Sequence, residues 1–198
     1  SVSPFELLSD AIGVIVHSRY ARDLLKSWYG SDLDASVVPH LREVEWLDAK
    51  SDAREALGLP RDAFVVCSFG FLDASKLNHL LLMAWEDSKL AENSRCHLVF
   101  VGENHGGDYG ADLLRQIRSL DANGRVQITG FADRARYRQY LQAADVAVQI
   151  RTMSRGETSG AILDCLSHGV PLIVNANGSL AETPREGAIV LEDNIDAS

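Results

Sequence analysis

Cysteine is scarce in this chain, with three residues among 198. Cys67, Cys96 and Cys165 each lie in an apolar stretch, and none belongs to a CxxC pair or has the spacing of metal ligands. Disulfide-rich secreted scaffolds and cysteine-based metal modules are therefore excluded. Isolated thiols in apolar surroundings are typical of a reducing compartment, so we expect a cytoplasmic protein.

Positive charge and long apolar runs are also in short supply. Lys and Arg number 19 against 28 Asp and Glu, a formal net charge of −9, which argues against a general binder of nucleic acid or of anionic membranes. No stretch approaches the roughly 18–20 consecutive apolar residues that a membrane-spanning helix needs. Hydrophobic residues still make up 46% of the chain, which is enough for a folded core rather than a disordered tail.

Short apolar runs alternate along the chain with longer stretches in which apolar residues recur every three or four positions. The first pattern predicts buried strands, and the second predicts helices that cover them. We expect strands at residues 12–16, 36–38, 64–69, 97–101, 126–129, 146–150, 172–175 and 188–191. We expect helices at residues 21–28, 51–57, 76–87, 111–120, 134–143 and 158–168. This order predicts an α/β fold with a doubly wound, Rossmann-like parallel sheet.

A charged stretch between Pro39 and Arg61 divides the chain. Residues 62–198 contain six of the expected strands, which is enough for a complete doubly wound unit. Residues 1–40 contain only two, too few for an independent core, so we expect them to be the end of a preceding domain. Residues 41–61 are then the linker between the two.

In open α/β sheets, ligands bind beyond the carboxyl ends of the strands. After the first strand of residues 62–198, Gly70 lets the chain turn, and Lys76 is expected to open the next helix. The loop is not a P-loop, because Ser75 precedes Lys76 directly and Leu77 follows it. Two interpretations of Lys76 stay open: a point charge that binds a phosphate, or a solvated lysine in a first helical turn.

The next two strand ends carry weaker signals. Gly102 follows the strand at 97–101 in a glycine-rich loop that does not match the GxGxxG dinucleotide pattern. Gly130 and Phe131 follow the strand at 126–129. The Phe131 ring either borders a planar base at the rim of the sheet or belongs to the core.

The junction after the strand at 146–150 is the richest in ligand-binding residue types. A helix that begins near residue 158 offers free backbone amides and the positive end of its dipole, and arginines add further charge, so the loop predicts an anion site suited to a diphosphate. Its candidate residues are Arg151, Arg155, Gly156, Glu157, Thr158, Ser159, Gly160 and, two turns on, Asp164. The alternative is a helix merely capped by Glu157 and Thr158, with Asp164 exposed.

Several segments together resemble the retaining family 4 glycosyltransferases of the GT-B type. They are Ser68-Phe69-Gly70, Thr129-Gly130-Phe131 and Gly156-Glu157-Thr158-Ser159-Gly160, followed by Gly169-Val170-Pro171. The resemblance implies that residues 62–198 are the nucleotide-sugar-binding half of such an enzyme, and that residues 1–40 end its acceptor-binding half. The acidic pair Glu157 and Asp164 is one position closer than in the family, and the second acid is Asp in place of Glu.

The resemblance also assigns roles to residues. Lys76 would hold the donor diphosphate, Glu157 would touch the transferred sugar, and Asp164 would bind the ribose. The amides of residues 158–160 would bind phosphate. Many relatives carry Arg directly after the first-loop glycine, where this chain has Phe71, so Arg151 and Arg155 are the candidates for the second cation.

The implied activity is transfer of a sugar from a nucleotide-diphosphate sugar to a glycan or lipid-linked acceptor, with retention of configuration and without a metal or other cofactor. GDP-mannose is one hypothesis for the sugar donor. The missing N-terminal half would hold the acceptor and make any membrane contact, so this chain alone would bind donor without turnover. Two other readings stay open: a non-catalytic nucleotide-sugar-binding module, and an α/β scaffold domain without a ligand.

Overall fold

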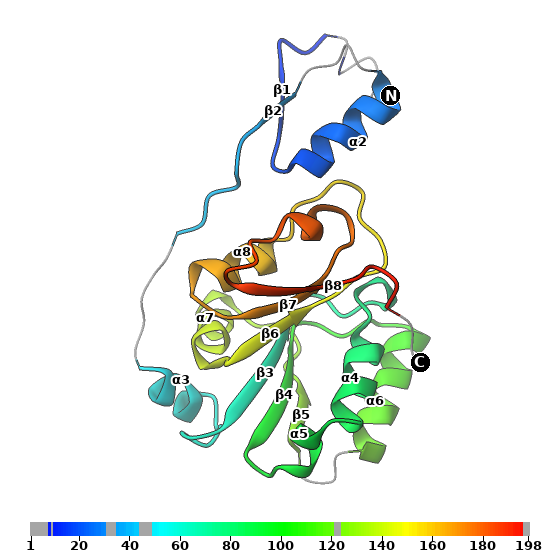
Figure 1. Cartoon of the computed structure of the whole chain (residues 1–198). Coiled ribbons are helices and arrows are strands. Elements are labelled where there is room, and N and C mark those ends of the chain that lie inside the picture. Colours follow the sequence, from blue (N-terminus) through cyan, green and yellow to red (C-terminus); the bar gives the residue numbers. More distant parts are fainter. Residues whose placement is uncertain (1–7, 9, 31–34, 44–48, 121–123, 196–198) are drawn as a thin grey trace.

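The computed structural model describes residues 8, 10–30, 35–43, 49–120 and 124–195. A small N-terminal unit lies above a larger six-stranded α/β body (Figure 1). Within the described ranges, none of the helices is long and apolar enough to cross a bilayer.

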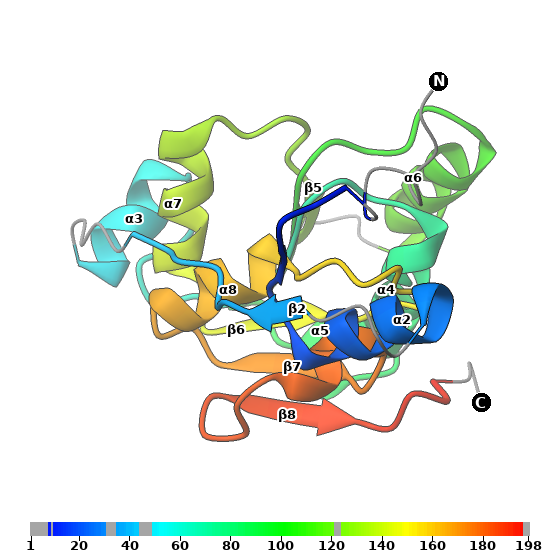
Figure 2. The same cartoon turned by 90° about the horizontal axis from the view of Figure 1, so that it is seen from above.

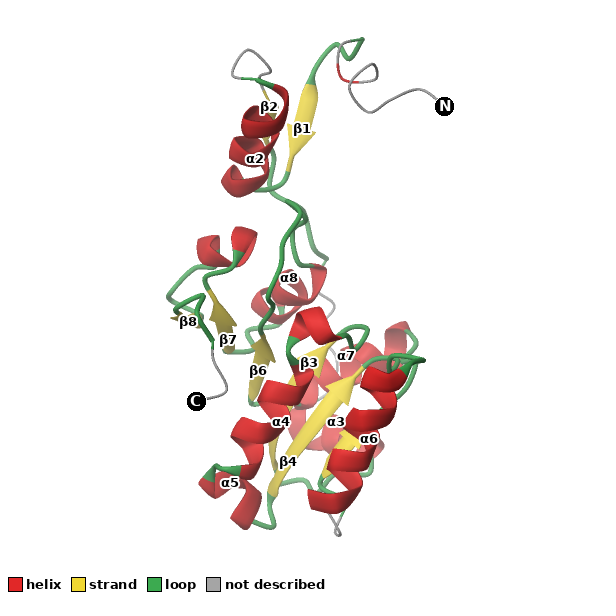
Figure 3. Ribbon diagram, turned by 90° about the vertical axis from the view of Figure 1, so that its right-hand side faces the viewer, coloured by secondary structure: helices red, strands yellow, loops and turns green. Residues whose placement is uncertain are grey.

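The N-terminal unit consists of β1 (Val14–Val16), α2 (Arg19–Tyr29) and β2 (Ala35–Val37). The two strands pair in parallel and form a sheet of their own, which Figure 3 shows apart from the larger one. Ser18 caps α2 by accepting a hydrogen bond from the Ala21 amide. The unit contacts the body where the amides of Arg19 and Tyr20 donate to the Glu182 carboxylate, at 3.1 and 2.6 Å.

The larger sheet is entirely parallel, and its strands lie in the order β5-β4-β3-β6-β7-β8. Their bounds are β3 (Phe64–Phe69), β4 (Cys96–Val101), β5 (Val126–Ile128), β6 (Val146–Gln149), β7 (Leu172–Asn175) and β8 (Ala188–Leu191). The chain builds outward from β3 in one direction and then returns to add β6 on the other side. This order confirms the predicted doubly wound fold, and it places a topological switch point between β3 and β6, where ligands bind in such sheets.

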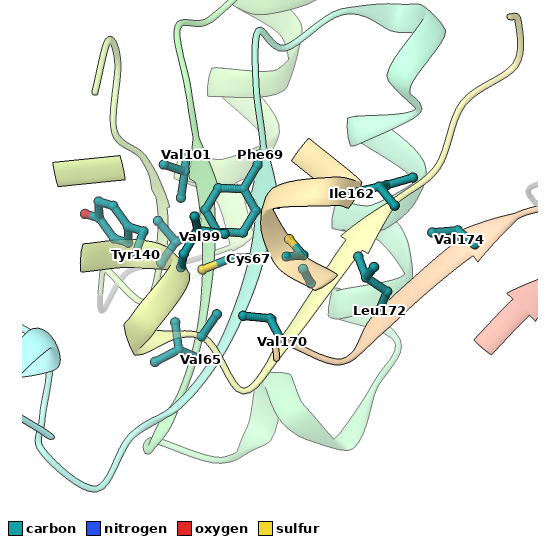
Figure 4. Packing of buried hydrophobic residues seen from close by; sticks show 14 of the residues in the cluster. Val65, Cys67, Phe69, Val99, Val101, Tyr140, Ile162, Val170, Leu172 and Val174 are labelled. Carbon is teal, nitrogen blue, oxygen red and sulfur yellow. The ribbon is translucent and has the colours of Figure 1, made fainter. Parts of the chain in front are cut away.

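Alternating side chains of β3 divide the core into two layers. Val65, Cys67 and Phe69 point to one face, where they pack with residues of α7 (Arg134–Ala143) and α8 (Gly160–Ser167), as Figure 4 shows. Val66 points to the other face, toward α4 (Asn78–Glu86) and α6 (Asp108–Leu120). Figure 2 shows α7 and α6 on opposite sides of the sheet. Because both faces are covered, each central strand needs an unbroken apolar run.

Several features of the helices differ from the sequence expectations. The helix expected from residue 76 begins at Asn78, because a 3₁₀ turn, η1 (Ala74–Lys76), is followed by Leu77 at φ 52° in the left-handed region. The short α5 (Lys89–Glu92) and the 3₁₀ segment η2 (Gly178–Glu182) were not expected. Within residues 41–61, the expected linker, α3 (Lys50–Ala56) packs on α7, and Leu59 is buried in the core.

Candidate functional site

The carboxyl ends of β3 and β4 meet in a close backbone contact. Gly70 has φ 106°, a conformation that favours glycine, and its amide donates to the Val101 carbonyl at 2.9 Å. A Cβ atom on Gly102 would lie 2.1 Å from the Gly70 carbonyl oxygen. The Gly102 amide donates to Thr129 Oγ1 at 3.0 Å, which ties the end of β4 to the end of β5. Gly70 and Gly102 therefore bring the loops that follow β3 and β4 together.

Replacing Gly102 with Ala is expected to lower the free energy of unfolding by roughly 1–3 kcal/mol, because backbone must move to admit the methyl group. Urea titration of the isolated chain measures this change. Gly106→Ala is the matched control, since a Cβ there meets nothing within 4 Å. Equal losses in the two variants would contradict the close approach of Gly102 to Gly70.

Lys76 lies at the end of η1 and folds back over Gly70. Its Nζ atom lies 2.7 Å from the position that a Cβ on Gly70 would take, so the absent side chain at Gly70 makes room for the ammonium. Burial lowers the pKa of Lys76, the nearby Arg151 guanidinium lowers it further, and Asp73 raises it. A half-buried ammonium beside a second cation differs from the solvated lysine of the alternative interpretation, and it suits an anionic ligand.

Arg151 follows β6, and its side chain is 13% exposed. Its guanidinium donates to Glu157 Oε1 at 2.8 Å. Burial lowers the pKa of Arg151, and the Glu157 charge raises it. The other oxygen of Glu157 accepts from the Arg155 amide at 2.7 Å, and Ser179 Oγ donates to the Glu157 carbonyl at 2.7 Å. The Glu157 side chain is thus held at both carboxylate oxygens while half of it remains exposed.

The helix after this loop begins later than the sequence predicts. The expected start at residue 158 is wrong: α8 begins at Gly160, and Ser159 is its N-cap residue, without a side-chain capping bond. Glu157 therefore lies before the cap and does not cap the helix. Thr158 Oγ1 is buried and has no hydrogen-bond partner among the described residues. Because Ser159 makes no side-chain capping bond, the first-turn amides of α8 are available to an anion, as at other helix N-termini.

Asp164 does not lie exposed as the alternative interpretation expects. Arg42 Nε donates to Asp164 Oδ1 at 2.7 Å, and the Tyr137 hydroxyl donates to Oδ2 at 3.2 Å. Burial, together with the negative charge of Asp164, raises the pKa of Tyr137 well above its ordinary value. These side chains line a hollow of about 310 Å³ between α7, α8 and residues 41–43, which also includes His168.

The structure gathers some of the predicted residues and leaves others at the rim. Lys76, Arg151 and Glu157 lie together at the switch point, linked by a hydrogen bond from the Thr152 amide to the Ser75 carbonyl at 2.9 Å. Arg155 is exposed, and it contacts Glu157 through its backbone amide. Phe131 is 80% exposed at the end of β5, next to Gly130 at φ 69°. Gly156, at φ 100°, faces Leu24 of α2.

Sequence reasoning missed Arg42, Tyr137 and Asn175. Asn175 ends β7, and its side chain bonds both backbone groups of Arg151, at 2.9 and 2.7 Å. The rule that ligand residues follow strand ends applies to Asn175 as well and would have found it. No local pattern marks Arg42 or Tyr137, whose place beside Asp164 depends on the packing of distant segments.

The fold is that of one Rossmann-like half of a GT-B glycosyltransferase, as comparison with solved structures shows. The chain belongs to the glycosyl transferases group 1 family, whose model matches residues 49–198. No curated protein matches the chain in sequence.

Three solved structures illustrate the likeness. Sucrose-phosphate synthase from Thermosynechococcus elongatus has a TM-score of 0.78 and 24% identity, over 98% of this chain and 48% of that one. Anabaena Alr3699/HepE, solved with UDP and glucose, has a TM-score of 0.78 and 22% identity, over 96% of this chain and 52% of that one. This chain thus spans about half the length of both.

The third is the C-terminal domain of a glycosyl transferase group 1 family protein, LpcC, from Francisella tularensis. It has a TM-score of 0.63 and 14% identity, over 75% of this chain and 76% of that domain. At these identities the likeness concerns the fold.

Proposed function

We propose that this chain is the donor-binding half of a retaining family 4 glycosyltransferase. It binds a nucleotide-diphosphate hexose, and the sugar passes to a glycan or lipid-linked acceptor held by an N-terminal half. In this proposal, residues 1–40 end that N-terminal half and residues 62–198 form the donor domain.

One observation carries the proposal: Lys76 and Arg151 lie together at the switch point of the sheet, beside Glu157 and close to the start of α8. Departure of a nucleoside diphosphate builds negative charge on its phosphates. The half-buried Lys76, the mostly buried Arg151 and a helix N-terminus stabilise that charge without a bound metal, so we propose a metal-independent reaction. Glu157, half exposed and fixed at both oxygens, faces the transferred sugar in this arrangement.

The chain's own residues supply the remaining contacts of the proposed donor site. The amides of residues 158–160 bind phosphate, and Asp164 binds the ribose after Arg42 moves away. The rim residue Phe131 borders the base. Anabaena Alr3699/HepE was solved with UDP, so we propose uridine as well as guanosine donors as candidates for this chain. The buried free thiols of Cys67, Cys96 and Cys165 support a cytoplasmic location.

Calorimetric titration of this chain with UDP, GDP, ADP and their sugar conjugates, each with and without EDTA, tests the proposal. We expect one nucleoside diphosphate to bind selectively and with the same affinity in EDTA. Binding that requires a divalent cation would contradict the metal-independent reaction. If none of these ligands binds, the titration is repeated on a protein that also carries the acceptor-binding half. Absence of binding there would favour a scaffold role.

Transfer activity separates an enzyme from a binding module. The protein with both halves is incubated with the preferred donor and glycan or lipid-linked acceptors, and the anomeric configuration of the product is read by NMR. A product with the configuration of the donor supports retention. An inverted product would contradict the family 4 assignment, and donor binding without transfer would favour the non-catalytic module.

Replacing Arg42 with Ala is expected to tighten nucleotide binding about 1.5- to 5-fold, the range that loss of a partly exposed ion pair gives. The reason is competition: Arg42 holds the Asp164 carboxylate that the ribose would use. Calorimetry on the isolated chain measures the change. Arg95→Ala, which removes an exposed partner of Asp62 far from α8, is the matched control. Weaker binding by Arg42→Ala would show instead that Arg42 contacts the donor.

A further inference from the structure

The fully buried side-chain amide of Asn175 makes two hydrogen bonds to the backbone of Arg151. The Arg151 amide donates to Asn175 Oδ1 at 2.9 Å, and Asn175 Nδ2 donates to the Arg151 carbonyl at 2.7 Å. Asn175 is 0% exposed and is the last residue of β7. The pair continues the ladder of β6 and β7 past the point where β6 ends, because the last register pair of these strands is Gln149 with Val174.

Asp193 and Asn177 hold the Asn175 amide in one orientation. Its Nδ2 also donates to Asp193 Oδ1 at 2.8 Å, and Asp193 Oδ2 accepts from Asn177 Nδ2 at 3.0 Å. Asp193 follows β8, so the ends of three neighbouring strands are joined in one network. The two N–H groups of Asn175 and its carbonyl oxygen are all engaged, which fixes the direction of the amide plane.

The network holds the Arg151 backbone where the residue that follows it meets the turn that carries Lys76. The charge of the Arg151 guanidinium lowers the pKa of Lys76, and the following residue, Thr152, is tied to the Lys76 turn through the Ser75 carbonyl at 2.9 Å. Asp73 opposes this effect on Lys76, and Glu157 pairs with Arg151. Two cations held together in this way are stabilised when a dianionic group binds between them.

We infer that Asn175 is a positioning residue that holds Arg151 beside Lys76 as the second cation of a diphosphate site. Arg151 then supplies the charge of the arginine that many relatives carry at the position of Phe71. Arg155, whose side chain is exposed, does not take that role. The inference rests on the proposed function in one respect, since the diphosphate is the anion that the donor supplies. The arrangement of Asn175, Arg151 and Lys76 is independent of it.

The affinity test compares UDP and GDP with uridine and guanosine by calorimetry. Asn175→Ala is expected to weaken binding of the nucleoside diphosphate roughly tenfold, because the displaced Arg151 side chain loses its charged hydrogen bond to the diphosphate. Nucleoside binding should stay unchanged. Arg151→Ala should give a similar loss, and the double variant should lose no more than the larger single loss. Additive losses would overturn the inference.

A second measurement needs no ligand, so it separates this inference from the proposed function. The pKa of Lys76 is followed by NMR on chain labelled at the lysine side chain. Asn175→Ala and Arg151→Ala should each raise that pKa toward the ordinary lysine value, because the neighbouring cation moves away or is removed. An unchanged Lys76 pKa in Asn175→Ala, with only a lower melting temperature, would overturn the inference even if nucleotides bind.

Two further variants distinguish the proposed effect on Lys76 from a general loss of folding. Asp193→Ala changes an exposed side chain, so it should fold, and it should give a smaller effect in the same direction. Asn104→Ala is the matched control, because the Asn104 amide also bonds backbone, at the Gly110 carbonyl 3.0 Å away, but does not contact Arg151. Equal effects of Asn104→Ala and Asp193→Ala on Lys76 would also overturn the inference.

Discussion

Replacing Lys76 with Met is expected to lower the rate of sugar transfer by a factor of roughly 10²–10³, the loss that follows removal of one preorganised charge-stabilising group. Met keeps the apolar stem and removes the ammonium that faces the leaving diphosphate. Folding should be unaffected, because the variant also removes a cation from beside Arg151. The rate is measured on the protein that carries both halves, with saturating donor.

The Lys76 ammonium also predicts how diphosphate binding depends on pH. Its pKa in the free chain is lower than that of an ordinary lysine, chiefly through burial and then through Arg151. The charged form binds the diphosphate, so affinity should fall as the pH rises through this lowered pKa, earlier than for a solvated lysine. Lys76→Arg keeps its charge throughout that range and should remove the decline.

Lys89→Met is the matched control for the Lys76 variant. Lys89 opens α5 and is exposed, so its loss should leave transfer and the pH profile unchanged. Transfer at the unaltered rate in Lys76→Met would show that the charge on the leaving group is stabilised elsewhere, and the site would have to be reassigned.

The second large effect concerns stability: Asp145→Ala should lower the free energy of unfolding by about 3–5 kcal/mol. Asp145 Oδ2 accepts from Arg54 at 2.6 Å and from the Val65 amide at 2.8 Å, and Oδ1 accepts from Lys50 at 3.1 Å. The Arg54 side chain is 9% exposed. Removing Asp145 leaves that guanidinium buried without its carboxylate. The loss also removes the hydrogen bonds that connect α3 to the start of β3.

Urea unfolding of the isolated chain measures this loss, and Asp52→Ala is the control. Asp52 lies on α3, as Arg54 does, and pairs with Arg61 at 2.7 Å. Both side chains of that pair are about half exposed, so removal of Asp52 should lower the free energy of unfolding by at most about 1 kcal/mol. A loss in Asp145→Ala as small as that in Asp52→Ala would show that α3 is held by apolar packing on α7 instead.

The strands were predictable because each is marked by its own apolar run. All eight were found within two residues of the expected bounds. In β3, every residue from Val65 to Phe69 is buried, so the run is continuous and both faces must be covered. The helix ends were less predictable. Leu77 in the left-handed region delays α4, and the cap at Ser159 delays α8, and neither follows from apolar periodicity.

The candidate site was predictable only where its residues follow strands. Gly70, Gly102 and Arg151 each come directly after a strand or within two residues of one, so the topology of a parallel sheet brings them to one edge. The partners of these residues were not predictable. Nothing in the sequence indicated that Glu157 would pair with Arg151, or Asp164 with Arg42.

By itself, the sequence determined the alternation of strands and helices, and with it the doubly wound class and the residue types along the carboxyl edge of the sheet. These are local properties, because burial of one face or both is recorded in the spacing of apolar residues within a single element. Only the tertiary structure decided which charges meet. The ion pairs of Asp164 with Arg42 and of Asp145 with Arg54, and the hydrogen bonds of Asn175 to Arg151, join separate elements. Such contacts depend on distances in space, which no periodicity along the chain encodes.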